Sequence, residues 1–398
     1  MNEEKSQTAA KSSPAKKLLI ASSLLIAAAL IQHLIFDLTG VEARQDLRMT
    51  DTEIGITYGF DVHASFYSPG ARHFFYATRN GVQNISSTGE LRWQHGFNMV
   101  QPTMVGRGDK VAIGEPGGHR IYVFGSAGYL YSVDLPYSVL YYTINAAGFL
   151  SVIMQTDIGY VVQIFNPVNP HEGRYGFWAP INDANVFPFS VDVSGCGTFV
   201  AKARLDVDTL VVSHLSMSFF SRMDSRGLPE GLFASYSFPD EFIVRVRFTG
   251  GGNLLVVTDR QIMGFSGNDN TQGPLWSIPL YNQPDMLYIG QNNFAYVTGD
   301  PFLNQPEAEE PGILRIYDFN GRLTGTYDLQ RRATHLSMAH NTALVGTDRT
   351  FYAINSHGQR LWTYSAIKDV RDVIFLDNTD TILLAGGTRA SVLRRLRV

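Results

Sequence analysis

The side chains that could do chemistry are scattered along the chain, and few have the spacing of a site. The ten histidines include one pair five residues apart, His335 and His340, and one histidine beside a carboxylate, His171-Glu172. A protein metal site needs three or four ligands that converge on the ion. The single cysteine, Cys196, excludes an intrachain disulfide and a zinc site built from two cysteines of this chain. We therefore predict no metal site.

Motifs of the common catalytic classes are missing as well. The chain has no Gly-x-Ser-x-Gly nucleophile elbow. It has no glycine-rich phosphate loop leading into a helix, since no helical periodicity follows the N-terminal segment. A net charge of -4 and a pI of about 6.2 do not suggest the basic face of a nucleic-acid-binding protein. We predict no catalytic residues, no bound cofactor and no nucleic-acid partner.

Two irregular segments carry charges that could recruit a partner. Residues 301–312 hold an acidic cluster, and residues 220–231 hold two arginines. Binding residues often lie in loops on a rigid scaffold, although a solvated loop without any ligand is the alternative for both segments. The candidate partner-binding residues are Glu307, Glu309 and Glu310 in the first segment and Arg222 and Arg226 in the second.

The composition favours an all-β scaffold beneath these loops. Charged residues make up 17% of the chain, aromatic residues 12%, and there are 37 glycines. Low charge with many aromatic residues and glycines is typical of short strands joined by tight turns. A chain of 398 residues is long enough for two or three ordinary domains, so internal repeats decide its organisation.

One hairpin pattern recurs seven times. In its clearest copy, TFYAINSHGQRLWTY at 350–364, a strand enters a polar turn that contains Gly358 and a second strand leaves with Trp362. Further strand-like runs between the copies bring each unit to about four strands, with a period of about 40–50 residues, which is typical of a β-propeller blade. The other copies lie at 81–93, 120–131, 160–178, 209–236, 261–276 and 314–327.

The last unit indicates how the ring closes. It contains three strands, at 369–376, 381–386 and 391–398, before the sequence ends. A lone strand at 54–60 can supply the fourth, which closes the ring and removes open sheet edges. We predict an eight-bladed propeller of four-stranded blades. Seven blades are the alternative, which requires the fourth unit to be an insertion.

A large aromatic residue follows each hairpin turn. Such a ring can pack between neighbouring blades while its N–H or O–H finds a polar partner. Residues spaced one blade apart on outer strands cannot converge on one ligand, so we interpret them as structural. They are Trp93, Tyr131, Trp178, Tyr236, Trp276, Tyr327 and Trp362.

The N-terminus predicts a single membrane span. Residues 18–36 form an apolar run of the length that crosses a bilayer, and lysines precede it, which places the N-terminus in the cytoplasm. A cleaved signal peptide with a small-residue site at 27–29 is the alternative. The predicted organisation is a cytoplasmic tail at 1–17, the anchor at 18–36, a linker at 37–51 and the propeller at 52–398.

The repeat resembles that of the quinoprotein-type (PQQ-like) β-propellers and, in style, WD40 repeats. INSHGQRLWTY at 354–364 carries the resemblance best, and IYDFNG at 316–321 keeps its turn. The layout is similar to uncharacterised bacterial membrane-anchored propeller proteins. The resemblance covers about residues 52–398 and implies the fold. It does not carry activity over, because quinoprotein dehydrogenases bind PQQ and Ca²⁺ at the ring centre, and no acidic cluster can be placed there from the sequence.

We therefore expect a non-catalytic interaction or scaffold module, displayed outside the cell membrane and binding a protein or polysaccharide partner of the cell envelope. The alternative is a ligand-binding sensor or quinoprotein-type enzyme that uses the central pocket. An interaction module should show an apolar or aromatic patch on one face. Use of the central pocket should show charged residues that converge on the ring axis.

Overall fold

The structure is a computed structural model of the chain, which divides into two compact units, Met1–Gln45 and Asp46–Val398. All residues that it describes belong to the second unit. In this part of the chain no helix is both long and apolar enough to span a bilayer, and the predicted tail, anchor and linker lie outside it. The described residues are 56–57, 64–170, 177–183, 185–208, 210–220, 231–267, 273–280, 284, 286–298, 312–377 and 379–395, with 56, 57, 177 and 178 as backbone only.

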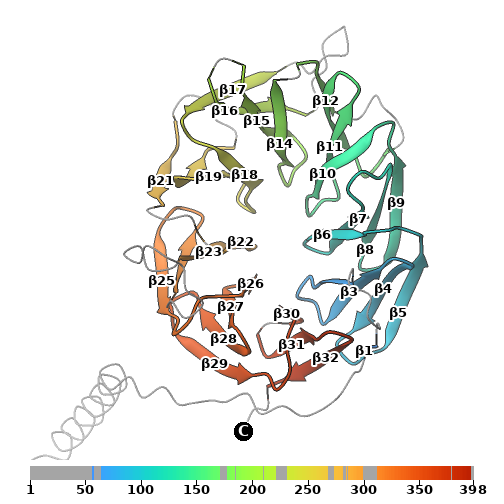
Figure 1. Ribbon diagram of the computed structural model, residues 1–398, viewed down its shortest axis with the longest axis vertical. Helices are drawn as coiled ribbons and strands as arrows, with labels where there is room; N and C mark the ends of the chain where they lie inside the picture. Colours follow the sequence, from blue (N-terminus) through green and yellow to red (C-terminus); the bar gives the residue numbers. More distant parts are fainter. Residues whose placement is uncertain are drawn as a thin grey trace, which may run out of the picture. The chain divides into compact units, whose positions relative to one another are not determined.

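The described residues form eight four-stranded antiparallel sheets arranged as the blades of a ring (Figure 1). Blade 1 consists of β2 (Ser65–Tyr67), β3 (His73–Thr78), β4 (Gly81–Ser86) and β5 (Leu91–Gly96). Blade 2 consists of β6 (Thr103–Arg107), β7 (Lys110–Gly114), β8 (Arg120–Gly125) and β9 (Gly128–Asp134). Blade 3 consists of β10 (Ser138–Ile144), β11 (Leu150–Thr156), β12 (Gly159–Phe165) and β13 (Phe177–Ile181). Blade 4 consists of β14 (Val186–Val193), β15 (Phe199–Asp206), β16 (Val212–Phe219) and β17 (Leu232–Pro239).

The other half of the ring repeats this order. Blade 5 consists of β18 (Ile243–Phe248), β19 (Leu254–Thr258), β20 (Gln261–Phe265) and β21 (Trp276–Pro279). Blade 6 consists of β22 (Met286–Ile289), β23 (Asn293–Thr298), β24 (Ile313–Asp318) and β25 (Leu323–Asp328). Blade 7 consists of β26 (His335–Ala339), β27 (Thr342–Thr347), β28 (Thr350–Asn355) and β29 (Arg360–Ser365). Blade 8 consists of β30 (Asp372–Phe375), β31 (Thr381–Ala385), β32 (Arg389–Arg394) and β1 (Ile56–Thr57).

The eighth blade joins the two ends of the propeller sequence. β1 pairs antiparallel with β32, with Ile56 opposite Ala390 and Thr57 opposite Arg389. The predicted eight blades and the closing strand are confirmed, and the seven-bladed alternative is wrong, because the fourth unit forms a regular blade. Closure covers the outer edge of β32, which would otherwise present unpaired backbone groups to other chains.

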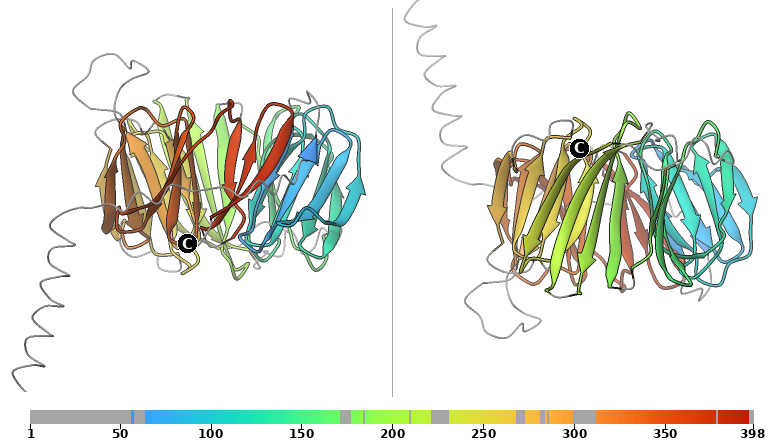
Figure 2. Two further views of the ribbon diagram at one scale, coloured as in Figure 1. Left: turned by 90° about the horizontal axis from the view of Figure 1, so that it is seen from below. Right: turned by 90° about the horizontal axis from the view of Figure 1, so that it is seen from above.

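The two faces of the ring differ in which ends of the inner strands they contain (Figure 2). The innermost strands of the eight blades are β2, β6, β10, β14, β18, β22, β26 and β30. Because each blade has four antiparallel strands, the chain leaves a blade on the same face from which the next inner strand begins. All inner strands therefore run in one direction. We call the face where they begin the start face and the opposite one the end face.

The hydrophobic core is divided into layers between neighbouring blades and does not form a single central core. The middle strands are covered on both sides, so they are near-continuous apolar runs, as in β19, where all five residues are buried. Leu254 and Val256 pack toward blade 4, whereas Leu255 and Val257 pack toward blade 6. This two-sided burial explains why the repeat carries apolar runs instead of strict alternation.

The aromatic residues after the hairpin turns lie at these blade interfaces. The indole N–H of Trp362 donates to the Thr379 carbonyl of blade 8 at 3.0 Å, and that of Trp93 donates to the Ser126 carbonyl of blade 2 at 3.1 Å. Trp276 makes the equivalent bond to blade 6, and the hydroxyl of Tyr131 donates to a carbonyl of blade 3. Tyr236 and Tyr327 pack against the clusters between blades 4 and 5 and between blades 6 and 7. The Trp178 side chain lies outside the described residues.

The structure adds one pair of strands that the sequence did not predict and explains one turn glycine that it did. β2 and β3 of the first blade belong to none of the seven hairpins and to none of the strand-like runs between them, although they form a regular half blade. The turn glycine Gly358 has φ +79, and a Cβ atom there would clash with the Thr326 backbone of the preceding blade. Glycine at this turn thus serves both the left-handed conformation and the close approach of two blades.

Candidate functional site

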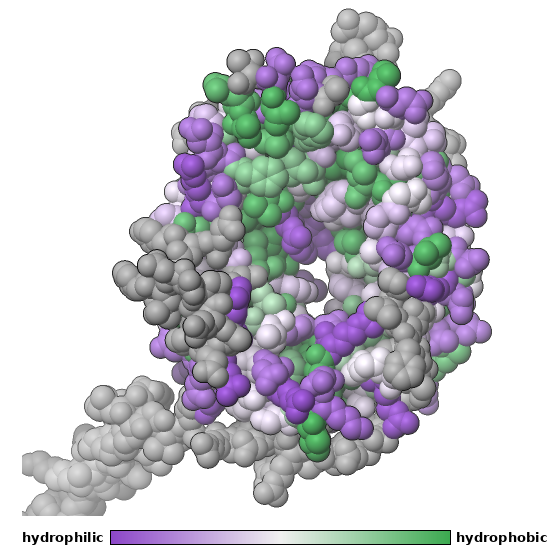
Figure 3. Space-filling view, in the orientation of Figure 1, coloured by the Kyte–Doolittle hydropathy of each residue, from purple (hydrophilic) through white to green (hydrophobic). Residues whose placement is uncertain are grey.

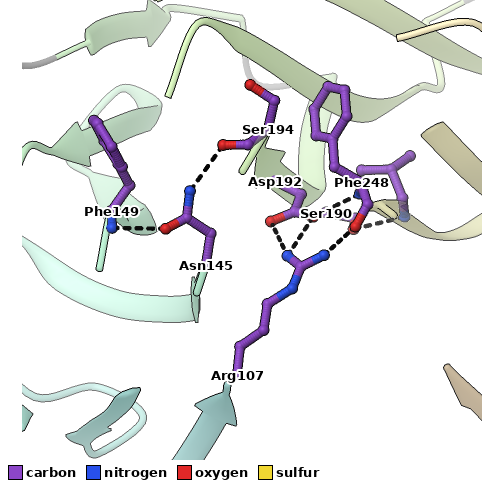
Figure 4. A network of polar contacts seen from close by, with 8 residues as sticks. Arg107, Asn145, Phe149, Ser190, Asp192, Ser194 and Phe248 are labelled. Carbon is purple, nitrogen blue, oxygen red and sulfur yellow. Dashed lines mark hydrogen bonds and ion pairs between the residues drawn. The ribbon is translucent and has the colours of Figure 1, made fainter. Parts of the chain in front are cut away.

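Side chains of blade 4 satisfy the free inner edge of blade 5. An innermost strand has unpaired N–H and C=O groups toward the ring axis. The Ser190 hydroxyl accepts from the Val246 amide at 3.1 Å, and the Asp192 carboxylate accepts from the Phe248 amide at 2.7 Å (Figure 4). Both side chains are buried. The Asp192 charge is therefore already engaged with β18.

Arg107 connects blade 2 to the same place. It is the last residue of β6, and its Nη1 lies 2.9 and 2.8 Å from the two carboxylate oxygens of Asp192 (Figure 4). Its Nη2 donates to the Phe248 carbonyl. The ion pair is mostly buried, with side-chain exposures of 17% for Arg107 and 3% for Asp192. One guanidinium thus ties blade 2 to blades 4 and 5, bypassing blade 3.

Blade 3 is tied to blade 4 by a separate contact. The side-chain amide nitrogen of Asn145, just after β10, donates to the Ser194 carbonyl at 2.9 Å. The side-chain oxygen of Asn145 accepts from the backbone amide of Phe149 at 2.9 Å (Figure 4). Hydrogen bonds through Arg107, Asn145, Asp192 and Ser190 therefore hold the channel wall from blade 2 to blade 5.

Two more arginines come from β18. Val246 and Phe248 pack into the core between blades 4 and 5, so the alternating Arg245 and Arg247 do not. Arg247 is surrounded by protein but keeps part of its surface open to solvent. Burial, together with nearby Arg107, lowers the pKa of Arg247 to about 10, so it remains charged at neutral pH. In the part of the chain that the structure describes, its guanidinium has no hydrogen-bond acceptor or ion-pair partner.

Three tyrosines from other inner strands surround these charges. Burial raises the pKa of Tyr67, Tyr141 and Tyr288, and the positive charge of Arg247 opposes the shift in each. Their hydroxyls therefore stay protonated and can donate hydrogen bonds. The Tyr67 hydroxyl donates to the Gly108 carbonyl at 2.9 Å. We call the following set the channel cluster: Tyr67, Arg107, Tyr141, Asp192, Arg245, Arg247 and Tyr288.

The channel cluster is positively charged, because it contains three guanidiniums and one carboxylate. Figure 3 shows an opening through the ring with hydrophilic residues at its wall. Of the nearby carboxylates, Asp109 is paired with Lys110 at 2.7 Å. Asp372 starts β30 and faces His335, the first residue of β26, with 3.6 Å between Nδ1 and Oδ1. Burial lowers the pKa of His335 and raises that of Asp372, while each group opposes the shift of the other.

A second feature lies on the start face of blades 3 to 5. Aromatic rings connect these blades: Phe187 contacts Tyr160 at a centroid distance of 5.6 Å, and Phe189 stacks on Phe242 at 4.9 Å. In Figure 3 hydrophobic side chains gather over the part of the ring that Figure 1 labels β14 to β18, and others lie near β10. We call the following residues the apolar surface: Leu140, Ile158, Tyr160, Phe187, Phe189, Val207, Leu210, Val211, Phe242 and Val244.

A comparison with protein-family profiles identifies the family of the chain. Residues 48–394 match the profile of a family of unknown function, DUF5711. The chain belongs to DUF5711. No curated protein sequence matches this DUF5711 chain significantly.

Solved structures share the fold of this DUF5711 propeller. The C-terminal WD40 domain of Sif2 is similar, with a TM-score of 0.55 and 11% identity, over 88% of this chain and 99% of that domain. BamB from Moraxella catarrhalis is similar, with a TM-score of 0.50 and 13% identity, over 87% of this chain and 100% of that one. At such identities the likeness shows the propeller fold alone, so function has to come from the residues.

The partner-binding residues predicted from the sequence belong neither to the channel cluster nor to the apolar surface. All of them fall outside the described residues, and their role stays a prediction. His335, noted for its spacing from His340, pairs with Asp372 instead. Within the described ranges no three His, Cys, Asp or Glu side chains are placed to hold a metal ion. The unplaced residues are Arg222, Arg226, Glu307, Glu309 and Glu310.

Sequence reasoning missed the channel cluster. Its members come from all of blades 1 to 6, and no local motif unites them. One signal was present, since Ile243-Val-Arg-Val-Arg-Phe248 places two arginines at alternate positions of an apolar strand. Charged residues at i and i+2 of a strand that is apolar on its other side indicate a polar environment for that side.

Proposed function

We propose that this DUF5711 chain is a membrane-anchored, extracytoplasmic propeller that acts as a non-catalytic interaction module and docks a protein partner of the cell envelope on the apolar surface. The apolar surface carries the proposal. Phe187 is 36% exposed, Phe242 40% and Leu210 73%, on neighbouring blades. Contiguous exposed apolar residues on a soluble domain are typical of sites of association.

The composition of the surface favours a protein partner over a polysaccharide. Aromatic rings on rigid strands supply large contact area at low entropic cost, as in the centres of protein interfaces. Branched aliphatic side chains such as Val244 and Leu210 suit an apolar partner surface better than sugar hydroxyls.

Charges at the edge of the apolar surface specify the partner further. The described loops of the start face around it are mainly acidic, with Arg260 as the one cation. In the described ranges none of their carboxylates has an ion-pair partner. Several accept backbone amides instead, as Asp259 does from Phe242 at 2.8 Å. The partner surface should therefore be apolar at its centre and basic around it. The acidic residues are Asp157, Asp183, Asp206, Asp208, Asp240, Glu241 and Asp259.

The envelope location rests on the N-terminal sequence. Residues 18–36 have the length and apolarity of a membrane helix, with lysines before them. The family match begins at residue 48, after this run. Both observations support a propeller that is carried on a separate anchor outside the cytoplasm.

Docking is tested by co-purification of the full-length chain from its native membrane. Leu210→Asp should lose a stoichiometric partner, because it places a charge in the apolar surface without disturbing the core. Leu323→Asp is the matched control, since Leu323 is 47% exposed on the outer strand of blade 6. The wild-type complex should also weaken with salt. Equal recovery of the partner with both variants would sink the proposal.

The ligand-binding alternative has a different observation in its favour. The channel cluster places charged residues of several blades together inside the ring, as use of a central pocket requires. It does not compete with the apolar surface, because the two involve different residues. The ligand that the cluster suits is inferred below.

A further inference from the structure

The charge of Arg247 is not neutralised by its surroundings. A guanidinium has five N–H donors and stays protonated, so it is buried at a cost unless it is paired. Within the described part of the chain it has no hydrogen-bond acceptor or ion-pair partner. Arg107 and Arg245 add charge of the same sign nearby, and Asp192 is the carboxylate that opposes them. Val246 and Phe248 on either side of it pack into the core between blades 4 and 5, and part of the Arg247 surface stays open to solvent.

Asp192, the one carboxylate of the channel cluster, cannot fill this role. Both of its oxygens lie within 3 Å of Arg107 Nη1, and one also accepts from the Phe248 amide. Arg107 is thereby held in place with its charge balanced. Among the described residues, neither Arg247 nor Arg245, two residues apart on β18, has an ion-pair partner.

Hydrogen-bond donors converge beside Arg247. The Tyr288 hydroxyl, from the neighbouring blade 6, has no partner within the described ranges, and the charges that act on its pKa are those of Arg247, the stronger, and Asp372. Planar guanidiniums with a neutral hydroxyl donor form a typical recognition set for carboxylate and phosphate groups. The two guanidiniums have donors only and are positively charged, so they would repel a cation.

We propose that the central channel binds a small oxyanion, a carboxylate or phosphate group, on Arg247, with Arg245 and Tyr288 as further donors and Arg107 held nearby by Asp192. This inference goes beyond the interaction role and specifies the ligand-binding alternative. The ligand is a small molecule, since it must enter the opening of the ring (Figure 3).

Thermal unfolding of the full-length chain in detergent tests the inference, with inorganic phosphate and succinate as probes and chloride at equal ionic strength as the reference. A ligand that binds only the folded state raises the unfolding midpoint with concentration. We expect phosphate or succinate to do so beyond chloride. A response to phosphate assigns a phosphoryl ligand, and a response to succinate a carboxylate.

Two variants localise the effect. Arg247→Gln should weaken the anion's apparent affinity by about tenfold to hundredfold, the value of a charged hydrogen bond. It should also raise the midpoint without ligand, because it removes an unpaired buried charge. Arg260→Gln is the matched control, since it removes the same charge from an exposed turn of blade 5. It should leave the affinity unchanged.

Three other results would contradict the inference. No midpoint change beyond chloride with either probe overturns the inference, and so does an equal response in Arg247→Gln and Arg260→Gln. A lower midpoint of unliganded Arg247→Gln with unchanged anion response would assign Arg247 a structural role. None of these outcomes bears on partner docking, because Leu210→Asp leaves the channel intact and Arg247→Gln leaves the apolar surface intact.

Discussion

Arg107 pairs with Asp192 at the wall of the central channel, 85 positions later in the sequence and two blades further around the ring. The same guanidinium donates to a carbonyl of the next blade, at Phe248. Neighbouring blades of a propeller are held by the apolar layers between them. This ion pair adds a connection that skips a blade, so it links parts of the ring that share no core.

Removing the carboxylate should show how much this connection stabilises the ring. Asp192→Ala leaves the Arg107 charge and the Phe248 amide without their acceptor, and we expect a loss of about 3–5 kcal/mol in the free energy of unfolding. Chemical denaturation measures it. The exposed pair of Arg120 and Asp134 provides the comparison, and Asp134→Ala should be almost neutral. Equal effects of the two substitutions would refute a structural role for Asp192.

Two substitutions of Trp362, the interblade tryptophan of blade 7, should separate the contributions of packing and of hydrogen bonding to stability. Trp362 is 2% exposed, packs between blades 7 and 8, and donates to the Thr379 carbonyl. Trp362→Ala should lower the free energy of unfolding by about 3–5 kcal/mol. Trp362→Phe keeps most of the packing, so its loss should be smaller, near the ~1 kcal/mol of one hydrogen bond together with the smaller ring. Similar losses for both variants would contradict the packing role.

His73 should make the ring less stable in mild acid. Burial, with Arg92 nearby, lowers the pKa of His73 to about 4. The neutral ring accepts from the Asn84 amide at 2.9 Å and lies 3.1 Å from the Ser126 hydroxyl of blade 2. The folded pKa is below the unfolded value of 6.5, so the stabilisation is present above pH 6.5. It is lost as the pH falls toward 4, by up to about 3 kcal/mol.

Unfolding midpoints at pH 7 and pH 5 check this. His73→Gln should reduce the difference between the two, because glutamine does not titrate. His357→Gln, at an exposed turn, should keep the wild-type difference. A wild-type difference that survives in His73→Gln would assign the acid sensitivity to another group.

The only cysteine of the chain provides a test of topology. Cys196 is exposed, and hydrogen bonds from Ser194 and Thr198 lower the pKa of its thiol, which increases the reactive thiolate. If the propeller is extracytoplasmic, a membrane-impermeant maleimide should label it on intact spheroplasts. Labelling only after lysis would place the propeller in the cytoplasm, and labelled protein in the soluble fraction would favour the cleaved signal peptide. Cys196→Ser controls for specificity.

Much of the fold could be predicted because it is local. A hairpin such as 350–364 needs only a turn glycine and two alternating strands, all within 15 residues, and seven copies make the period visible. The count of eight and the closing strand β1 followed from one missing strand at the end of the chain. β2 and β3 were harder, because the first blade has no preceding unit to set the period.

The candidate sites could not be predicted in the same way. Arg107 meets Phe248 over 141 positions, and Tyr67 and Tyr288 reach the same place from blades 1 and 6. The apolar surface likewise joins Phe189 to Phe242 from separate blades. The hydrophobic pattern of a strand shows that one side is buried or polar, but not which strand faces it.

The sequence by itself determined an all-β ring of eight blades and the residues that build its turns and interfaces, because those depend on contacts between near neighbours. Only the tertiary structure brought Arg107, Asp192 and Arg247 together and left Arg247 without an acceptor among the residues that the structure describes. The reason is ring closure, which places each inner strand against strands that are distant in the chain. Which residues become neighbours in this way depends on the geometry of the whole ring, so no regular spacing in the sequence indicates them.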